Sequence, residues 1–287
     1  MTIEAVEGHA GLPELLLTHG ESHLRLSLQG AHITEYSVAG DELLWVSQSA
    51  TFAPGAAIRG GIPLCWPWFG ASPDDAAWPQ HGFARTAAFR LESQTSSAEG
   101  SAVVLTMEGS APILPWQGAA SLQVEIRLSD HLWMELRTTN ASNRELRLGA
   151  GLHSYFAVSD CHTIQIPSVT GLDYLDKPSG FARKTQTDAL VIDGEVDRVY
   201  LHPPRRAELV DAARSRRVMI DAWGNTDLVV WNPGATVATS MADFDDEGYR
   251  KMVCIEPAIA LDNRIRLRPG ECHAIGQTIS VCCLGVS

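Results

Sequence analysis

His153 and Glu256 are the two side chains of this chain best suited to moving protons. His153 lies between apolar neighbours in Gly-Leu-His-Ser-Tyr-Phe, and Glu256 ends an apolar run in Met-Val-Cys-Ile-Glu-Pro-Ala. An imidazole titrates near neutral pH and burial raises the pKa of a carboxyl group, so the two residue types suit a general acid and a general base. Each also has a structural interpretation, as a buried histidine with satisfied hydrogen bonds and as a glutamate that pairs with an arginine.

A second candidate segment, which cannot be a regular helix or a long strand, runs from Arg59 to Arg85. It combines two arginines, adjacent glycines, prolines and large aromatic residues. Guanidinium groups offer paired donors to phosphate or carboxylate oxygens, and Gly60 and Gly61 would let the backbone approach a ligand closely. The aromatic faces could line a pocket, or they could fill the core beneath a long loop while the arginines are solvated. These aromatic residues are Trp66, Trp68, Phe69 and Trp78.

Weaker signals come from four other places. Asp197, in Glu-Val-Asp-Arg-Val-Tyr, could accept hydrogen bonds from ligand hydroxyls or pair with Arg198. The acidic cluster at 243–247 lacks the spacing of a calcium loop, so we expect a solvated turn and no metal. Cys65 has no evident activating neighbour, and we expect a buried, unreactive thiol. Gly149-x-Gly151 fails the dinucleotide fingerprint at its third position, and we expect no cofactor.

Composition limits the class of protein. The 287 residues include 22 Lys and Arg against 34 Asp and Glu, a net charge of −12, which argues against a nucleic-acid partner. The first residues resemble no secretory signal and no apolar run reaches the length of a membrane span, so we expect a cytoplasmic protein without a membrane partner, and a monomer. The six cysteines show no zinc or disulfide spacing and are expected to be reduced, with Cys282 and Cys283 on a buried terminal strand.

The elements that must position these residues are predicted to be strands. Apolar and polar residues alternate at 122–128 and 132–136 across Ser-Asp-His, which indicates a hairpin. Helical periodicity is nearly absent, with a turn or two expected around 245–251. Many short strands without a linker predict one all-β domain, residues 1–287, built as an antiparallel sandwich or barrel. Other strand candidates are 12–46, 103–107, 146–156, 164–169, 217–221, 227–231, 253–255 and 275–281.

Six motifs in one order resemble the hexose-6-phosphate mutarotases, a branch of the aldose 1-epimerase superfamily. They extend from residue 59 to residue 258, most of the chain, and an ordered series is far more specific than any single motif. The loop at 71–78, between the two arginine motifs, leaves the preferred hexose open. The motifs are Arg59-Gly-Gly-Ile-Pro-Leu-Cys-Trp-Pro-Trp-Phe-Gly, Gln80-His-Gly-Phe-Ala-Arg, Leu152-His-Ser-Tyr-Phe, Asp197-Arg-Val-Tyr, Val230-Trp-Asn-Pro-Gly and Cys254-Ile-Glu-Pro-Ala.

The resemblance implies a large β-sandwich of the galactose mutarotase type, with few short helices, and metal-free interconversion of the α and β anomers of a sugar 6-phosphate. It implies that His153 protonates the ring oxygen while Glu256 takes the proton of the anomeric hydroxyl. Arg59 and Arg85 would bind the phosphate, and Gln80 and Asp197 would contact hydroxyls. His81 and Trp66, within the same motifs, are also expected at the substrate site.

Two alternatives to this interpretation stay open. A non-catalytic carbohydrate-binding protein would need the aromatic platform but not the His153 and Glu256 pair. An epimerase for unphosphorylated aldoses would keep the pair and would not need Arg59 or Arg85. The partner is a small sugar or sugar phosphate in all three cases.

Overall fold

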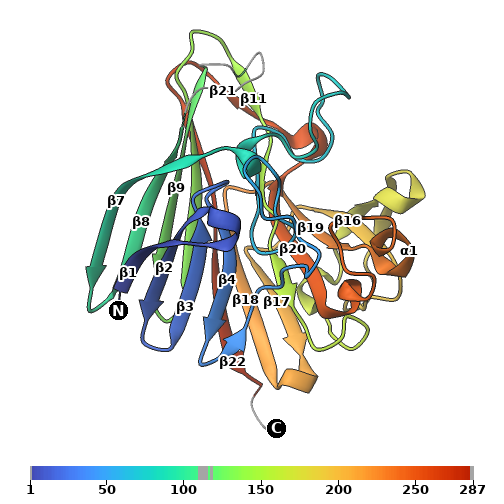
Figure 1. Ribbon diagram of the computed structural model, residues 1–287. Helices are drawn as coiled ribbons and strands as arrows, with labels where there is room; N and C mark the ends of the chain where they lie inside the picture. Colours follow the sequence, from blue (N-terminus) through green and yellow to red (C-terminus); the bar gives the residue numbers. More distant parts are fainter. Residues whose placement is uncertain (1, 109–115, 117–118, 285–287) are drawn as a thin grey trace.

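The computed structural model describes residues 2–108, 116 and 119–284, and its sheets are antiparallel throughout. Three large sheets and one two-stranded ribbon make up the fold (Figure 1). The prediction of an all-β antiparallel sandwich is therefore confirmed.

The seven-stranded sheet forms one wall of the sandwich, with the strand order β17-β18-β22-β10-β9-β8-β7. Buried and less buried residues alternate along β8 and β10, because successive side chains of a strand point to opposite faces. The predicted hairpin is confirmed, with Leu132 of β10 opposite Leu128 of β9. The strands are β7 (Phe89–Ser97), β8 (Gly100–Met107), β9 (Ala120–Leu128), β10 (Leu132–Asn140), β17 (Arg206–Asp211), β18 (Arg216–Trp223) and β22 (Cys272–Cys283).

A five-stranded sheet packs on the part of this wall formed by β8 and β9 (Figure 1). Leu17 of β2 and Leu26 of β3 belong to the same apolar core as Leu105 of β8 and Val124 of β9. The expected strands at 12–46 fall in this sheet up to residue 42; the segment 43–46 makes isolated bridges instead. The strands are β1 (Thr2–Glu7), β2 (Pro13–His19), β3 (Ser22–Ser27), β4 (His32–Val38) and β5 (Asp41–Glu42).

An eight-stranded sheet completes the sandwich, and it carries most of the candidate site. Its strand β20 lies between β19 on one side and β12 with β13 on the other, and every residue of β20 is buried. The strands are β6 (Leu64–Cys65), β12 (Ala150–Leu152), β13 (Tyr155–Ala157), β14 (Asp173–Asp176), β15 (Ala182–Thr185), β16 (Val196–Leu201), β19 (Asp227–Asn232) and β20 (Met252–Ile259). The separate ribbon pairs β11 (Leu146–Leu148) with β21 (Ile265–Leu267).

Helical structure is limited to short pieces. One α-helix, α1 (Gly234–Ala238), occurs in the described residues and was not predicted. The turn expected around 245–251 is a 3₁₀ turn. No helix of residues 2–108, 116 and 119–284 combines the length and apolar character of a membrane span. The 3₁₀ turns are η1 (His9–Gly11), η2 (Ala84–Thr86), η3 (Pro167–Val169), η4 (Lys177–Ser179), η5 (Ala212–Arg214), η6 (Gly248–Lys251) and η7 (Leu261–Asn263).

Two local predictions are wrong. The segment 164–169 is not a strand: Gln165 and Ile166 make isolated bridges, and Pro167, which has no N–H to donate, begins the turn η3. Cys282 and Cys283 do lie on a terminal strand, but both are exposed because β22 continues past the buried core at its end.

Candidate active site

The middle of the eight-stranded sheet brings His153 and Glu256 together. Strands β12 and β13 both pair with β20, so the connection between them, residues 153–154, runs beside Glu256. Nδ1 of His153 lies 3.4 Å from Oε2 of Glu256, and the two side chains are 9% and 1% exposed. Neither atom has a hydrogen-bond partner among the described residues. Unpartnered buried polar atoms cost stability, so a facing pair of them indicates a function.

Burial moves the proton affinities of this pair in opposite directions. It lowers the pKa of His153 well below its usual value, and the nearby charges of His81, Arg59 and Arg85 add to the effect. Burial raises the pKa of Glu256 well above its usual value, with the negative charge of Asp197 adding to it. Both shifts favour the uncharged forms, a neutral imidazole and a protonated carboxyl group. One proton and one acceptor are what bifunctional acid–base catalysis needs.

Aromatic rings fix the orientation of the His153 imidazole. The ring of Tyr155 is stacked on it at a centroid distance of 4.8 Å and an interplanar angle of 10°. Phe69 is stacked at 6.4 Å, and Trp231 approaches edge-on at 6.0 Å. A ring packed between aromatic neighbours presents its nitrogens in defined directions, which proton transfer requires.

His81 lies next to His153, with ring centroids 5.2 Å apart, and is held as a neutral ring. Burial lowers its pKa to about 3, with the positive charge of Arg85 contributing next. The backbone N–H of Gly70 donates to Nδ1 of His81 at 3.3 Å, and Sγ of Cys65 lies 3.2 Å from the same nitrogen. An accepting Nδ1 leaves the ring proton on Nε2, so His81 can donate one hydrogen bond to a ligand.

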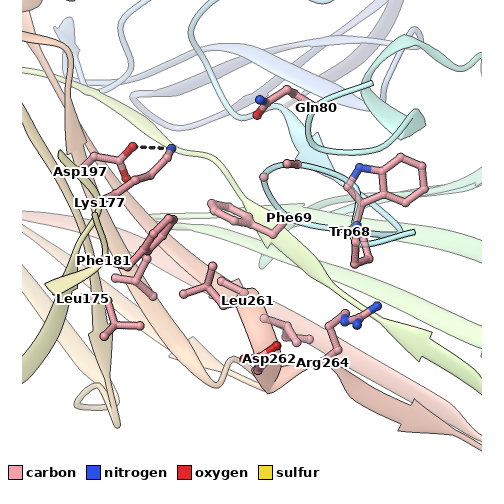
Figure 2. A pocket seen from close by; sticks show the side chains of 16 residues that line it. Trp68, Phe69, Gln80, Leu175, Lys177, Phe181, Asp197, Leu261, Asp262 and Arg264 are labelled. Carbon is pink, nitrogen blue, oxygen red and sulfur yellow. Dashed lines mark hydrogen bonds and ion pairs between the residues drawn. The ribbon is translucent and has the colours of Figure 1, made fainter. Parts of the chain in front are cut away.

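A cavity of about 470 Å³ adjoins the pair. Figure 2 shows the side chains that line it. Phe69 connects the two, because it lines the cavity and stacks on His153. Gln80 and Asp197, both expected at the substrate site, lie on the cavity wall, whereas His153 and Glu256 do not. Leu175, Val199 and Ile259 add apolar surface, and Lys177 and Arg264 are the cationic residues on the wall. An apolar cavity with a few polar groups fits a small polar ligand.

Arg59 and Arg85 influence the site without lining the cavity. The guanidinium of Arg59 pairs with Asp243, Nη2 to Oδ2 3.1 Å, and donates to the hydroxyl of Tyr155 at 3.1 Å. Arg85 donates to the backbone oxygen of Gln80 at 2.8 Å. The charges of both arginines lower the pKa values of His81 and His153. The expectation that 243–247 is only a solvated turn is wrong for Asp243, whose partner is 184 residues away in sequence.

Two expectations for the Arg59–Arg85 segment need correction. Trp66 was expected to contact substrate, but it is fully buried: its indole N–H donates to Oγ1 of Thr138 at 2.9 Å, and the ring packs on Trp116 and Phe83. Gly60 and Gly61 were expected to let the backbone approach a ligand; they adopt positive φ values, and their backbone packs closely on other parts of the chain. A Cβ there would lie 2.4 Å from Cα of Val46 and 2.2 Å from the oxygen of Ile33, respectively.

Two side-chain groups in the described residues have the donor types of a metal site. His153, Cys254 and Glu256 form one, and Asp160, Cys161 and His162 the other, each with ligand atoms within 4.8 Å of one another. Metal binding needs a thiolate, and burial raises the pKa values of Cys254, Cys161 and Glu256. A metal ion bound at either place would have to displace a thiol proton.

Comparisons with known proteins place the chain in a family. The sequence profile described as "Aldose 1-epimerase" matches residues 13–280, so the chain belongs to the aldose 1-epimerase family. A relative from Escherichia coli K12, named "Putative glucose-6-phosphate 1-epimerase", is 32% identical over 272 residues, covering 93% of this chain and 90% of the relative. A relative of the same name from Cenchrus ciliaris is 33% identical, covering 93% and 84%.

Solved structures agree with this family. The crystal structure of YeaD from Salmonella typhimurium, described as a "putative mutarotase", superposes with a TM-score of 0.90 at 27% identity, covering 98% of this chain and 94% of that one. The predicted fold class and the predicted family are thus both confirmed.

Proposed function

We propose that this member of the aldose 1-epimerase family interconverts the α and β anomers of a hexose 6-phosphate, with glucose 6-phosphate the expected substrate. The observation that carries the proposal is the buried pair of His153 and Glu256, whose Nδ1 and Oε2 atoms face each other at 3.4 Å without hydrogen-bond partners among the described residues. Two curated relatives that share about a third of its residues bear the name "Putative glucose-6-phosphate 1-epimerase", which supports the choice of substrate.

Ring opening uses both members of the pair. His153 gives its proton to the ring oxygen while Glu256 takes the proton of the anomeric hydroxyl, and the bond between the ring oxygen and C1 breaks. The product is the open aldehyde with a free hydroxyl at C5. Rotation about the C1–C2 bond presents the other face of the carbonyl, and the two proton transfers reverse as the ring closes. The pair returns to its starting state, so no other reactant is consumed.

The resting pair favours the proton on Glu256, whereas this assignment needs it on His153. A bound phosphate supplies a negative charge, and an anion near an imidazole raises its pKa. The phosphate is therefore expected to assist the chemistry as well as binding. Arg59 and Arg85 are its proposed partners, Gln80 and Asp197 contact hydroxyls from the cavity wall, and His81 donates from Nε2.

A second candidate function is anomer interconversion of unphosphorylated aldoses. One observation favours it: the Arg59 guanidinium already pairs with Asp243, and neither Arg59 nor Arg85 lies on the cavity wall. The cavity itself offers Lys177 and Arg264 as cations, and the side chain of Arg264 has no hydrogen bond or ion pair with any described residue.

Exchange NMR of the anomeric protons tests both candidates. Catalytic amounts of the protein are added separately to glucose 6-phosphate, glucose and galactose, each against a protein-free sample. Faster exchange for glucose 6-phosphate than for the free sugars supports the proposal. Equal acceleration of the free sugars supports the second candidate, and no acceleration for any of them contradicts both and supports a binding protein.

A further inference from the structure

Lys177 occupies a position next to Asp197 that the sheet itself determines. Strand β14 pairs with β16 so that Asp176 lies opposite Arg198, and the next step of this antiparallel register brings Lys177 beside Asp197. Nζ of Lys177 lies 2.6 Å from Oδ2 of Asp197, and both residues line the cavity (Figure 2). The Asp197 side chain is 13% exposed and that of Lys177 is 53% exposed. The carboxylate is thus mostly enclosed, while half of the lysine faces open space.

This ion pair leaves one acceptor and two donors free on the cavity wall. The Asp197 side chain makes no other hydrogen bond with the described residues, so Oδ1 remains free to accept. An ammonium group carries three N–H donors, and Lys177 uses one of them on Asp197. Adjacent hydroxyls of a pyranose each donate and accept hydrogen bonds. A carboxylate oxygen and an ammonium held side by side can therefore bind one hydroxyl each, with charge-assisted bonds.

The neighbouring pair of Lys184 and Asp176 shows what is particular to Lys177. Lys184 belongs to β15 and ion-pairs with Asp176, and the exposures of these side chains, 44% and 12%, are close to those of the first pair. Lys184 also donates to Oγ of Ser179, and neither Lys184 nor Asp176 lines the cavity. The two pairs share composition, burial and location, and differ in whether they face the cavity. Lys184 is therefore a matched control.

We propose that Lys177 is a specificity-determining residue, which together with Asp197 binds two adjacent hydroxyls of the sugar ring. This inference rests on the proposed function and adds to it a residue whose task is hydroxyl recognition rather than phosphate recognition. The salt bridge with Asp197 keeps the carboxylate aimed into the cavity, and the two remaining N–H groups complete the donor and acceptor set.

Deoxy sugars separate hydroxyl recognition from the other tasks that a lysine could perform. The protein, Lys177→Met and Lys184→Met are compared by exchange NMR on glucose 6-phosphate, on its 2-deoxy, 3-deoxy and 4-deoxy analogues, and on glucose. Lys177→Met should lower kcat/KM for glucose 6-phosphate about tenfold to a hundredfold, the loss typical of one charged hydrogen bond. With the unaltered protein, kcat/KM for at least one deoxy analogue should lie below that for glucose 6-phosphate by a similar factor. Lys177→Met should not lower kcat/KM for that analogue any further. Lys184→Met should match the unaltered protein.

Three results would overturn the inference. The first is that Lys177→Met leaves kcat/KM for glucose 6-phosphate unchanged. The second is that Lys177→Met lowers kcat/KM by the same factor for every deoxy analogue, which would show that Lys177 binds none of these hydroxyls. The third is that Lys177→Met loses activity on glucose 6-phosphate alone and not on glucose, which would make Lys177 a phosphate residue. Melting temperatures exclude misfolding of the variants. Absence of exchange with the unaltered protein would instead contradict the proposed function, and the inference with it.

Discussion

The buried pair, His153 and Glu256, and the cavity rim, Lys177 and Asp197, differ in how their charges are stabilised. His153 and Glu256 are almost completely enclosed, face each other without hydrogen bonds and are pushed toward neutral forms. Lys177 and Asp197 are charged and paired at 2.6 Å, with the lysine half exposed. Proton transfer benefits from groups whose charges are not already stabilised, whereas recognition of hydroxyls benefits from charges held in place. The same sheet supports both. Glu256 lies on β20 and His153 in the connection between β12 and β13, while Asp197 lies on β16 and Lys177 in the turn η4 that follows β14.

The largest expected effect comes from removing the acid of the buried pair. His153→Asn should lower kcat for glucose 6-phosphate by roughly 10²–10⁴-fold, the usual contribution of general acid–base catalysis, with little change in KM. Exchange NMR over a range of substrate concentrations measures both constants. His23→Asn, at an exposed histidine on β3, is the control and should have no effect. A kcat loss below tenfold for His153→Asn would contradict its assignment as the acid.

Smaller effects are expected from replacing Arg59 and Arg85, and these effects should change KM. Arg85→Ala and Arg59→Ala should each raise KM for glucose 6-phosphate by about tenfold to a hundredfold, since a hydrogen bond to a charged group contributes about 1.5–3 kcal/mol. The KM for glucose should stay unchanged. Arg90→Ala, at an exposed arginine on β7, is the control. If KM for glucose 6-phosphate is unchanged in both variants, these arginines do not bind the phosphate, and unphosphorylated sugars become the favoured substrates.

The smallest effect is on stability, and it depends on pH. The folded-state pKa of Glu256 lies above its unfolded value, so its contribution to the free energy of unfolding is fully present below the unfolded pKa and is lost as pH rises through the folded pKa. Glu256→Gln removes the buried charge and should melt at a higher temperature than the unaltered protein at about pH 8.5. The difference should shrink toward about pH 5.5.

The control for this stability measurement is Glu99→Gln, at an exposed carboxylate in the turn between β7 and β8. It should change the melting temperature little at either pH. A melting temperature of Glu256→Gln that is equal to or below that of the unaltered protein at both pH values would show that the carboxylate is stabilised in the fold, contrary to its burial.

Strand structure could be predicted because its signal is local. The alternation of apolar residues at 122–128 and 132–136 identified the hairpin of β9 and β10, since burial on one face of a sheet has a period of two. The same rule failed at 164–169, where Pro167 has no N–H to donate and begins the turn η3. Both features depend on residues that are close in sequence, so the sequence alone can indicate them.

Long-range pairing could not be predicted in the same way. Nothing around Asp243 indicates that it binds Arg59, and nothing around Lys177 indicates that it meets Asp197 across two strands. Trp66 was expected to contact substrate because an indole suits a pocket as well as a core, and only packing decides between the two. Residue type and apolar surroundings identified His153 and Glu256 as candidates, and the motif resemblance implied their roles, while their mutual distance required the register of β12, β13 and β20.

The central claim is that the buried pair moves protons while the rim only binds, and Glu256→Gln tests it most directly. Calorimetric titration with glucose 6-phosphate and anomeric exchange NMR are carried out on the same sample of this variant. The account predicts that the dissociation constant stays within a few fold of the unaltered protein while the exchange rate falls by roughly 10²–10⁴-fold. Exchange at the rate of the unaltered protein would contradict the claim, because the base would then lie elsewhere.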